Sequence, residues 1–396
     1  MKSTTAIVAL GMLTLAPTAD VRGEGDWEVT PASDQALERG LDWLERNQGP
    51  EGNWTSNDLG LVSLGAMAFM ASGHTPGRGR YGRTVQRALD YVLDNAKPSG
   101  LLNIAQSQHE MYNHGLATFV LGQAHGMTPG GDRRLNTELD RALRLISNVQ
   151  CEDGGWGYQA LRQRSGHDLS LVVMQAKALR SAMDSGLEVQ PAVVDMAIRS
   201  VREHYGECRG RRGSPNAGQL REQFIYTKGG NEGSIAMAAA GVVCLQEFGQ
   251  YDDWRIPPNI EVILEGIRAV QNKRQAEMAK NPKSSRSHDG TMPFDAYTLY
   301  YVGQALYQVG GPSWQEAYPV LRDYLVNSQV LDADSPVRHG HWMDRGCMAG
   351  GRVSGRPGEL FGTAVACFIL AIPNRYLPIL QEGKIESLRR PNQRDR

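Results

Sequence analysis

The chain has few cysteines, almost no net charge and no long hydrophobic segment beyond its first residues. Its 396 residues include five cysteines, an odd and widely scattered set that excludes a disulfide framework. A formal net charge of −1 gives no overall attraction to nucleic acid or to acidic surfaces, so we expect no nucleic-acid partner. No later stretch is long and apolar enough to cross a bilayer, and we expect no membrane span.

The five cysteines fall into two groups. Cys244 and Cys367 lie in apolar helical segments and are predicted to be buried thiols. Cys151, Cys208 and Cys347 lie in predicted turns or loops, which leaves room for one disulfide after export.

Residues 1–23 have the features of a secretory signal. Lys2 is followed by an apolar run at residues 6–15 and then by small residues. The run is too short to span a bilayer stably, which favours a cleaved signal over a membrane anchor. Cleavage after Ala19 or Gly23 would give an exported protein, in the periplasm or outside the cell.

The segment at residues 150–158, which reads Gln-Cys-Glu-Asp-Gly-Gly-Trp-Gly-Tyr, organises the sequence. It follows an apolar pattern of helical period at residues 139–149 and precedes a second helical segment at residues 171–183. The paired glycines allow positive φ where the chain reverses, and the tryptophan can cover the end of the preceding helix. Helix, turn and helix form one unit.

Weaker copies of this unit occur on both sides, with a period of about 50 residues that indicates an array of like units. Because each unit must bury its apolar face against its neighbours, we expect one domain at residues 27–378. A polar, basic tail at residues 379–396 is predicted to be disordered. The predicted helix pairs are 36–44 with 58–72, 88–93 with 111–125, 139–149 with 171–183, 193–205 with 234–248, 260–271 with 295–309, and 318–329 with 360–372.

The two helices of each unit differ in composition. The first helices carry charge on one face, whereas the second are rich in Gly, Ala and Ser and apolar nearly all round, as at residues 234–242. We therefore expect the first helices outside and the second inside. This predicts an all-α fold, an α/α toroid of about six helix pairs with an inner and an outer ring; an open solenoid is the competing geometry.

The Gln-x-x-Asp-Gly-Gly-Trp turn between helix pairs resembles the QW-type repeat of squalene–hopene cyclases and of protein prenyltransferase β-subunits. The similarity covers most of the predicted domain. Residues 111–118 and 372–378 more closely resemble exported, uncharacterised bacterial proteins of that superfamily, of the kind common in planctomycetes. The resemblance implies the toroid and says little about function.

The catalytic motifs of these families are missing here. The cyclases protonate their substrate with an Asp-x-Asp-Asp motif; its nearest equivalents here, residues 251–254 and 332–334, fall in predicted loops and are interpreted as solvated turns. The prenyltransferases hold zinc with Asp-x-Cys and a distant His, and this sequence has no Asp-x-Cys. The resemblance therefore implies the architecture without the acid or the zinc.

One segment has a spacing compatible with a metal site, but it also contains several glycines and coincides with a degenerate copy of the turn. We predict neither a metal nor a cofactor. A Gly-Cys-Gly-Glu-Gln thioester, a Gly-x-Ser-x-Gly elbow, a P-loop and a dinucleotide fingerprint are absent from the sequence. The residues with the metal-like spacing are His339, His341, Asp344 and Cys347.

Polar residues cluster at the predicted starts of the inner helices, which surround one end of the central funnel in a toroid. Asp and Ser at such positions are also common helix caps. His114 lies one turn into an inner helix, and the carboxylate of Asp168 beside His167 could set the tautomer of that imidazole. The candidate catalytic residues are His114, His167, Asp168 and Asp295, and the candidate ligand contacts are Tyr112, Asn113, Tyr297, Tyr300 and Tyr301.

Three long insertions, at residues 206–233, 273–293 and 331–358, each join an outer helix to its inner partner. Connections of this kind lie on one face of a toroid, so we expect them to rim the mouth of the funnel. Helix N-termini add positive potential to the same face. The arginines expected to attract anionic groups there are Arg211, Arg212, Arg345 and Arg352.

Three functions remain open at this point. The leading hypothesis is a secreted binding or scaffold protein whose funnel takes a small, lipid-like molecule that is apolar or partly anionic. The second is a divergent terpene cyclase or isomerase whose acid has moved to one of the candidate residues. The third is a glycan-processing toroid enzyme with two facing carboxylates. A dry funnel lined by aromatic side chains would support the second hypothesis. A solvent-filled groove with two facing carboxylates would support the third. The sequence determines neither the ligand nor the oligomeric state.

Overall fold

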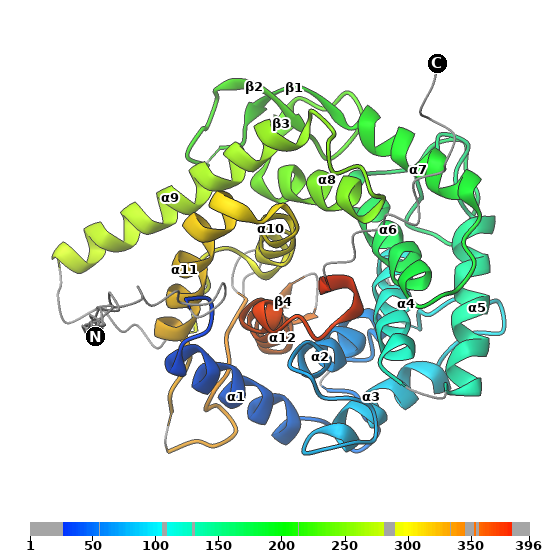
Figure 1. Cartoon of the computed structure of the whole chain (residues 1–396), viewed down its shortest axis with the longest axis horizontal. Helices are drawn as coiled ribbons and strands as arrows, with labels where there is room; N and C mark the ends of the chain where they lie inside the picture. The colour runs from blue at the N-terminus through cyan, green and yellow to red at the C-terminus, as the bar shows by residue number, and fades with distance from the viewer. Residues whose placement is uncertain are drawn as a thin grey trace, which may run out of the picture.

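Helices alternate between an outer and an inner ring along the chain (Figure 1). The computed structural model describes residues 27–54, 56–104, 109–128, 131–212, 214–280, 290–332, 334–344, 352–353 and 356–381. The outer helices are α1 (Pro31–Arg46), α3 (Gly82–Asp94), α5 (Arg133–Asn148), α7 (Pro191–Glu203), α9 (Ile256–Lys280) and α11 (Gly311–Ser328). The inner helices are α2 (Leu59–Ala71), α4 (Glu110–Gly126), α6 (Leu169–Asp184), α8 (Ile235–Glu247), α10 (Ala296–Val309) and α12 (Gly358–Ala371).

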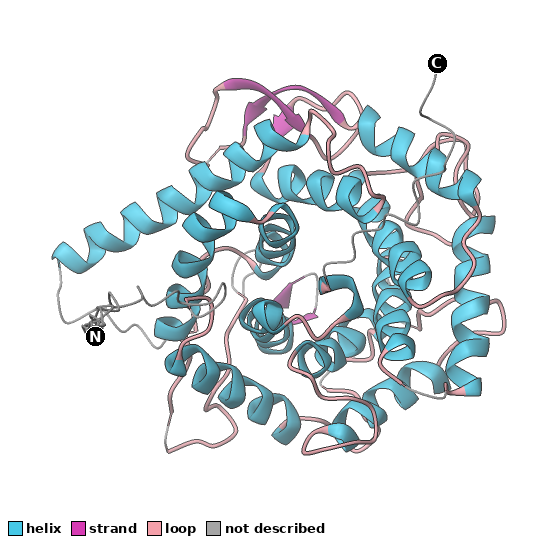
Figure 2. Ribbon diagram, viewed as in Figure 1, coloured by secondary structure: helices cyan, strands magenta, loops and turns pink. Residues whose placement is uncertain are grey.

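The inner helices form a closed ring. Each packs against the next in chain order, and α12 packs against α2, so the predicted α/α toroid of six helix pairs is confirmed and the open solenoid is excluded. Figure 2 shows the two concentric rings. All thirteen residues of α2 are buried, which is why this helix has no polar face, whereas α1 and α5 bury one side and expose the other.

The turn after α5 is fastened by two side chains. The side-chain amide of Gln150 donates hydrogen bonds to the carbonyl oxygens of Gly154 (3.1 Å) and Val193 (2.9 Å), the second of which is on α7. The indole nitrogen of Trp156 donates to the carbonyl oxygen of Ile146 near the end of α5 (2.9 Å). Together they join an outer helix, its turn and the next outer helix.

Two other units carry the same fastening. Gln48 and Trp54 make the corresponding bonds after α1, and Gln329 and Trp342 make them after α11. The three units that retain both side chains thus share one local geometry, as the sequence repeat predicts.

The glycine of this turn meets two demands. Gly154 has a φ of 82°, and a Cβ at that position would lie 2.0 Å from the carbonyl oxygen of Met196 on α7. Gly340, the equivalent residue after α11, has a φ of 100° and would place a Cβ 2.4 Å from the carbonyl oxygen of Arg39 on α1. Left-handed backbone and close approach of the next outer helix both require the absence of a side chain.

The first long insertion folds into a three-stranded sheet instead of the expected loop. Strand β1 (Tyr205–Gly210) pairs antiparallel with β2 (Leu220–Phe224) and parallel with β3 (Glu232–Gly233). The ring of Phe224 fills the space over Gly241 of α8, where a Cβ would meet it at 2.1 Å. Figure 1 shows this sheet at the outer edge of the toroid, beside α8 and α9.

The other two insertions also differ from simple loops. Helix α9 continues to Lys280, so the first part of the second insertion is helical and projects from the ring (Figure 1); residues 281–289 lie outside the described part of the chain. In the third insertion, β4 (Arg352–Val353) pairs antiparallel with β5 (Arg356–Pro357) immediately before α12.

The end of the described chain closes one side of the ring. The short 3₁₀ helices η2 (Ile372–Asn374) and η3 (Pro378–Leu380) follow α12, and η3 packs against α4 and α6. The backbone N–H of Ile379 donates to Oε1 of Gln123 (3.0 Å), and Ile379 and Leu380 are buried. The described chain therefore remains packed against the ring as far as Leu380.

The predicted signal segment and residues 382–396 of the predicted tail lie outside the described residues. None of the described helices has the length and hydrophobicity needed to cross a bilayer. Cys244 and Cys367 are buried thiols, as predicted, and Cys151 and Cys208 are also buried and not joined in a disulfide. Cys347 lies outside the described part of the chain.

Candidate functional site

The start of α6 holds an ordered histidine–carboxylate pair. Oδ1 of Asp168 caps the helix by accepting the backbone N–H groups of Ser170 (2.9 Å) and Leu171 (3.2 Å), and it also accepts the hydroxyl of Ser170. Oδ2 of Asp168 lies 3.0 Å from Nδ1 of His167. The Asp168 side chain is fully buried, whereas that of His167 is 55% exposed. The buried carboxylate of Asp168 thus holds the imidazole of His167 in position while the ring stays exposed to solvent.

Two tyrosines from neighbouring loops enclose this pair. The hydroxyls of Tyr158 and Tyr226 lie 2.5 Å apart, and the ring of Tyr158 meets that of His167 edge-on at 4.6 Å between centroids. Burial and the charge of Asp168 raise the pKa of Tyr226 to about 12, and burial, the contact with Tyr226 and Asp168 raise that of Tyr158 further. Both phenols are therefore neutral hydrogen-bond donors at physiological pH. We call Tyr158, His167, Asp168, Ser170 and Tyr226 the mouth group.

Four more tyrosines meet at the centre of the ring. The hydroxyls of Tyr112 on α4 and Tyr301 on α10 are 3.4 Å apart. The ring of Tyr301 makes edge contacts with those of Tyr297 (5.0 Å) and Tyr300 (5.4 Å). Tyr300 and Tyr301 are almost completely buried, and burial raises the pKa of both phenols well above 10. The structure therefore brings these four predicted ligand contacts together, as packed side chains.

A buried ion pair lies two turns further along α6. Nζ of Lys177 is 3.0 Å from Oε1 of Glu247 on α8, it contacts Oε1 of Gln304 on α10, and it sits 4.5 Å from the ring centroid of Phe119 on α4. Both charged side chains are 1% exposed. The pair was not among the predicted site residues, although Lys177 is the only lysine in the six inner helices. It joins four inner helices through the middle of the ring.

His114 does not face the same space as His167. Its Nδ1 accepts the backbone N–H of Leu102 (3.1 Å), and its Nε2 lies 3.2 Å from the carbonyl oxygen of Ala142 on the outer helix α5. The side chain is fully buried, and burial lowers the pKa of His114 to about 4 despite the bond to Ala142. The expectation that His114 shares a cavity with His167 is therefore corrected: His114 is a neutral packing residue between the two rings.

The remaining predicted polar residues of the inner helices have structural contacts. The carboxylate of Asp295 caps α10, accepting the N–H (3.0 Å) and the hydroxyl (2.8 Å) of Thr298. Asp58 caps α2 through the N–H of Leu61 (3.2 Å). The side-chain amide of Asn113, buried against α2, donates to Asn103 (3.1 Å).

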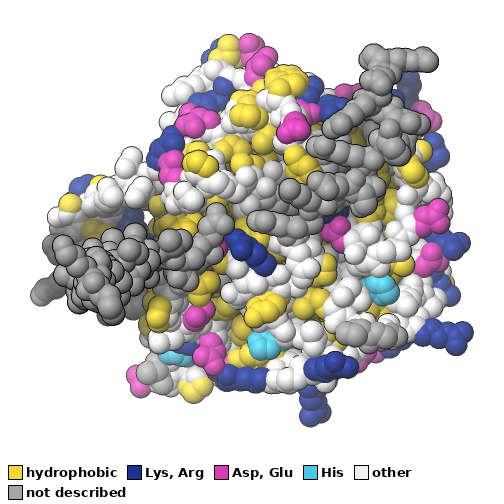
Figure 3. All heavy atoms as spheres, in the orientation of Figure 1, with side chains coloured by type: hydrophobic (Ala, Val, Ile, Leu, Met, Phe, Trp, Pro, Cys, Tyr) yellow, Lys and Arg dark blue, Asp and Glu magenta, His cyan; other side chains and the backbone are white. Residues whose placement is uncertain are grey.

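The arginines expected at the mouth that lie in the described residues are found in two separate places. Arg211 and Arg212 directly follow β1 in the peripheral sheet and are exposed, with Nε of Arg211 3.8 Å from Oε1 of Glu232. Arg352 lies on β4, whereas Arg345 lies outside the described residues. On the face shown in Figure 3, basic and acidic side chains are interspersed around the periphery.

The metal-like segment is occupied by turn contacts. Nδ1 of His341 lies 2.5 Å from the carbonyl oxygen of Arg338, and its ring stacks on that of Trp43 at 5.5 Å. In the described part of the chain, no three potential ligands converge on one point. Cys347, the fourth residue with the metal-like spacing, lies outside that part.

An open cavity lies beside the starts of α2 and α12. It has a volume of about 340 Å³ and is situated where the last unit of the ring meets the first. Its walls combine apolar and polar side chains, and we call it the seam pocket. It is lined by Trp43, Asn47, Trp54, Val337, Arg338, His341, Met343, Glu359 and Leu360.

Solved structures with a similar fold include a type II terpene cyclase. A variant of the type II terpene cyclase MstE from Scytonema, in complex with its substrate geranylgeranyl dihydroxybenzoate, matches with a TM-score of 0.50 and 11% sequence identity, over 87% of this chain and 98% of that one. The apo form of MstE matches with a TM-score of 0.47 and 11% identity, over 88% and 100%. No protein-family model and no curated protein sequence matches. At this identity the similarity establishes the terpene-cyclase-like toroid fold, which the QW-type resemblance implies.

Proposed function

We propose that this protein is an exported binding toroid that holds a small apolar molecule with one anionic end, and that the ligand occupies the seam pocket. The observation that carries the proposal is the pocket itself, an open cavity with an aromatic wall and a cation at its edge. The centre of the ring, where sequence analysis placed the ligand, is filled by Tyr300, Tyr301 and the Lys177–Glu247 pair.

The tryptophans of the seam pocket are held in fixed positions. The indole nitrogen of Trp43 donates to the carbonyl oxygen of Val337 (2.7 Å), and that of Trp54 donates to Leu44 (2.8 Å). Because both polar atoms are already bonded, the rings offer apolar surface to the cavity. Met343 and Leu360 extend this surface. An apolar body would displace water from this wall without leaving a polar group unpaired.

One guanidinium defines the polar end of the pocket. Arg338 lies on its lining with its side chain 69% exposed, and its Nε is 4.0 Å from Oδ2 of Asp332; Glu359 adds a carboxylate to the same lining. A carboxylate or phosphate of a ligand could approach this weakly paired cation at the solvent boundary. We therefore favour an amphipathic ligand, such as a prenyl acid, over a purely hydrocarbon one.

Binding of farnesoic acid, followed by tryptophan fluorescence or calorimetry, tests the site, with farnesol as the uncharged analogue. Arg338→Gln should weaken the acid about threefold to fivefold and leave farnesol unchanged, since an exposed charge pair contributes roughly 1 kcal/mol. Val337→Asp should weaken both. Arg212→Gln, an exposed arginine in the peripheral sheet, serves as the control. Unchanged affinity in both pocket variants would place the ligand elsewhere.

A second candidate function is acid–base catalysis in the mouth group, such as isomerisation of a small substrate. The observation that favours it is the exposed imidazole of His167, oriented by buried Asp168 and flanked by the phenol of Tyr158. Protonation of an alkene by an inner-helix carboxylate, as a cyclase requires, is disfavoured because Asp58, Asp168 and Asp295 act as helix caps. Turnover lost in His167→Ala but retained in Arg338→Gln would support the mouth group over the seam pocket.

Export is supported by the Lys2 and residues 6–15 pattern. We also infer that the chain is related to exported bacterial members of the repeat superfamily, on the evidence of residues 111–118 and 372–378. Mass spectrometry of the native protein should give an N-terminus near Asp20 or Glu24. Recovery of a chain that retains Met1 would contradict export by this signal.

A further inference from the structure

One tryptophan is much more exposed than the others. The sequence contains seven, and all seven are in the described residues. Trp254 is 60% exposed, Trp27 is partly buried, and the remaining five are in the core. Tyr251, three residues earlier, is 48% exposed. Leaving two large rings in water forgoes burial free energy, and paired exposed aromatics commonly mark binding surfaces.

The exposed indole is held in a defined orientation. The guanidinium carbon of Arg255 lies 4.4 Å from its ring centroid, and the ring of Tyr205 meets it nearly at right angles at 5.1 Å. An aromatic ring that is already positioned loses little conformational entropy when a ligand stacks on it.

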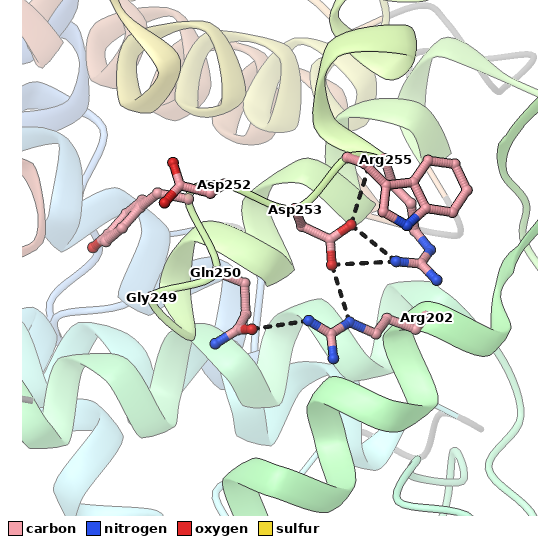
Figure 4. Close-up of a pocket in the computed structure, with 8 residues that line it drawn as sticks. Arg202, Gly249, Gln250, Asp252, Asp253 and Arg255 are labelled. Atoms are coloured by element: carbon pink, nitrogen blue, oxygen red, sulfur yellow. Dashed lines mark hydrogen bonds and ion pairs between the residues drawn. The ribbon is translucent and has the colours of Figure 1, made fainter. Parts of the chain in front are cut away.

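A pocket of about 530 Å³ lies beside this ring, in the turn between α8 and α9 and against the end of α7. We call it the turn pocket, and Figure 4 shows its polar residues. It is lined by Arg202, Gly249, Gln250, Tyr251, Asp252, Asp253, Trp254 and Arg255.

The polar side chains of the turn pocket are fixed by one another. Oδ2 of Asp253 is 3.0 Å from Nε of Arg202, and Oδ1 is 3.0 Å from Nη1 of Arg255. Nη2 of Arg202 donates to Oε1 of Gln250 (2.9 Å). Burial would raise the pKa of Asp253, but the hydrogen bonds from Arg255 and Arg202 outweigh it and lower the pKa. Asp253 is thus an ionised anchor, and Figure 4 shows the carboxylate of Asp252 directed away from this network.

The lining carries two arginines and two aspartates, so its charges balance. A phosphate or sulfate would find both guanidinium groups already engaged by Asp253, and a cationic ligand would find only Asp252. Balanced, planar polar groups next to a positioned aromatic face suit a ligand with many hydroxyls and an apolar face of C–H groups.

We propose that the turn pocket binds a neutral oligosaccharide. A pyranose ring would stack on Trp254, with Tyr251 contacting an adjacent sugar, and vicinal hydroxyls would donate to the carboxylate of Asp252. The site binds and does not hydrolyse its ligand, because its two carboxylates are sequence neighbours and Asp253 is held ionised between two arginines, which leaves no facing acid and base.

A panel of neutral hexasaccharides tests the proposal: cellohexaose, maltohexaose, laminarihexaose, xylohexaose, mannohexaose and chitohexaose. At least one should bind the full-length protein in calorimetry and change its tryptophan fluorescence. Trp254→Ala should weaken that binding about tenfold, as expected for the loss of one aromatic stacking partner, and Asp252→Asn should weaken it less. Tyr376→Ala removes an equally exposed aromatic residue elsewhere (51% exposed) and should have no effect.

Two results would overturn the proposal. The first is failure of every neutral hexasaccharide to bind. This includes the case in which an anionic oligosaccharide, hexagalacturonate, is the only one that binds and salt abolishes its binding. The second is binding that Trp254→Ala leaves unchanged. Should Trp254→Ala fold poorly by circular dichroism, Tyr251→Ala provides the same comparison, and unchanged binding in that variant would equally reject the site.

Discussion

The side-chain amide nitrogen of Gln329 lies 2.8 Å from the carbonyl oxygen of Ala36 and donates a hydrogen bond to it across 293 residues of sequence. Gln48 bonds to Thr84 (2.9 Å) and Gln150 to Val193 (2.9 Å) in the same way. In each case the acceptor is on the next outer helix around the ring. Gln329 therefore bonds to α1 in the way that the other two glutamines bond to the next outer helix in the chain. The hydrogen bond that joins neighbouring units thus also closes the ring.

Replacing Gln329 with Ala should loosen this closure. The variant loses buried bonds from its amide to Ala36 and Gly340, and each is worth on the order of 1 kcal/mol. We expect a loss of about 2 kcal/mol in the free energy of unfolding by urea. Gln48→Ala removes the two equivalent bonds within the ring but no counterpart of the bond that Gln329 accepts from Nε of Arg39 (2.8 Å), so it should cost somewhat less; a negligible loss in both variants would show that the fastening is dispensable.

The requirement for glycine in the turn can be tested against another glycine that also has a positive φ but has free space where a Cβ would lie. Gly154→Ala would place a Cβ 2.0 Å from the carbonyl oxygen of Met196, whereas Gly186, with a φ of 77°, has nothing within 4 Å of that position. Gly186→Ala should cost about 1 kcal/mol from backbone strain alone. Gly154→Ala should cost about 3 kcal/mol or more, because the two backbones must also separate. Equal losses would mean that close approach is not what selects Gly154.

The fold could be predicted from sequence because its signals are local and repeated. Apolar residues of helical period, glycines at the turns and the Gln and Trp fastening give both the helix pairs and their packing partners. The length of α9 could not be obtained this way. Its last turns, residues 271–280, are almost entirely exposed, so no apolar pattern marks them, and the helix continues on intrinsic propensity.

The buried pair at the centre of the ring provides a third test. Lys177→Met should destabilise the protein by about 3–5 kcal/mol, since Glu247 would remain buried without its counter-charge. Adding Glu247→Gln removes that charge and leaves an amide whose oxygen can still accept the hydrogen bond from Gln308, so the double variant should recover at least half of the loss. Additive losses in urea unfolding would show that the two side chains are not coupled.

Acid should weaken the fold through two buried histidines. Burial lowers the pKa of His114 to about 4; burial, followed by the charge of Lys228, does the same for His204. The unfolded chain, with histidine pKa values near 6.5, then binds protons that the native state does not, so stability is complete above pH 6.5 and falls as the pH drops toward 4. At pH 5 the loss should be on the order of 2 kcal/mol per histidine.

Urea unfolding of the wild type and of His114→Gln at pH 7.5 and pH 5 measures this effect. The variant should be less stable at pH 7.5 because it loses a packed ring. Its further loss between the two pH values should be about half that of the wild type. An identical pH dependence would show that His114 remains neutral in both states or charged in both.

His114 also shows why the candidate site was harder to predict than the fold. Both His114 and Tyr112 lie at the start of one predicted inner helix, yet residues two apart on an α-helix point about 200° apart around its axis. Tyr112 meets Tyr301 at the centre of the ring, and His114 contacts α5 outside it. The angular positions of the two residues around the helix axis would have placed their side chains on different faces. The seam pocket had no such signal, because it forms only when the last unit meets the first.

The C-terminal segment has a consequence for biosynthesis. A ribosome makes α11, α12 and η3 last, yet α11 supplies the closing bond to α1 and η3 covers the ends of α4 and α6. A nascent chain therefore carries several complete helix pairs whose inner faces have no final partner until α11, α12 and η3 have been made. The ring cannot close before these elements have left the ribosome, and its early units depend on being kept from association until then.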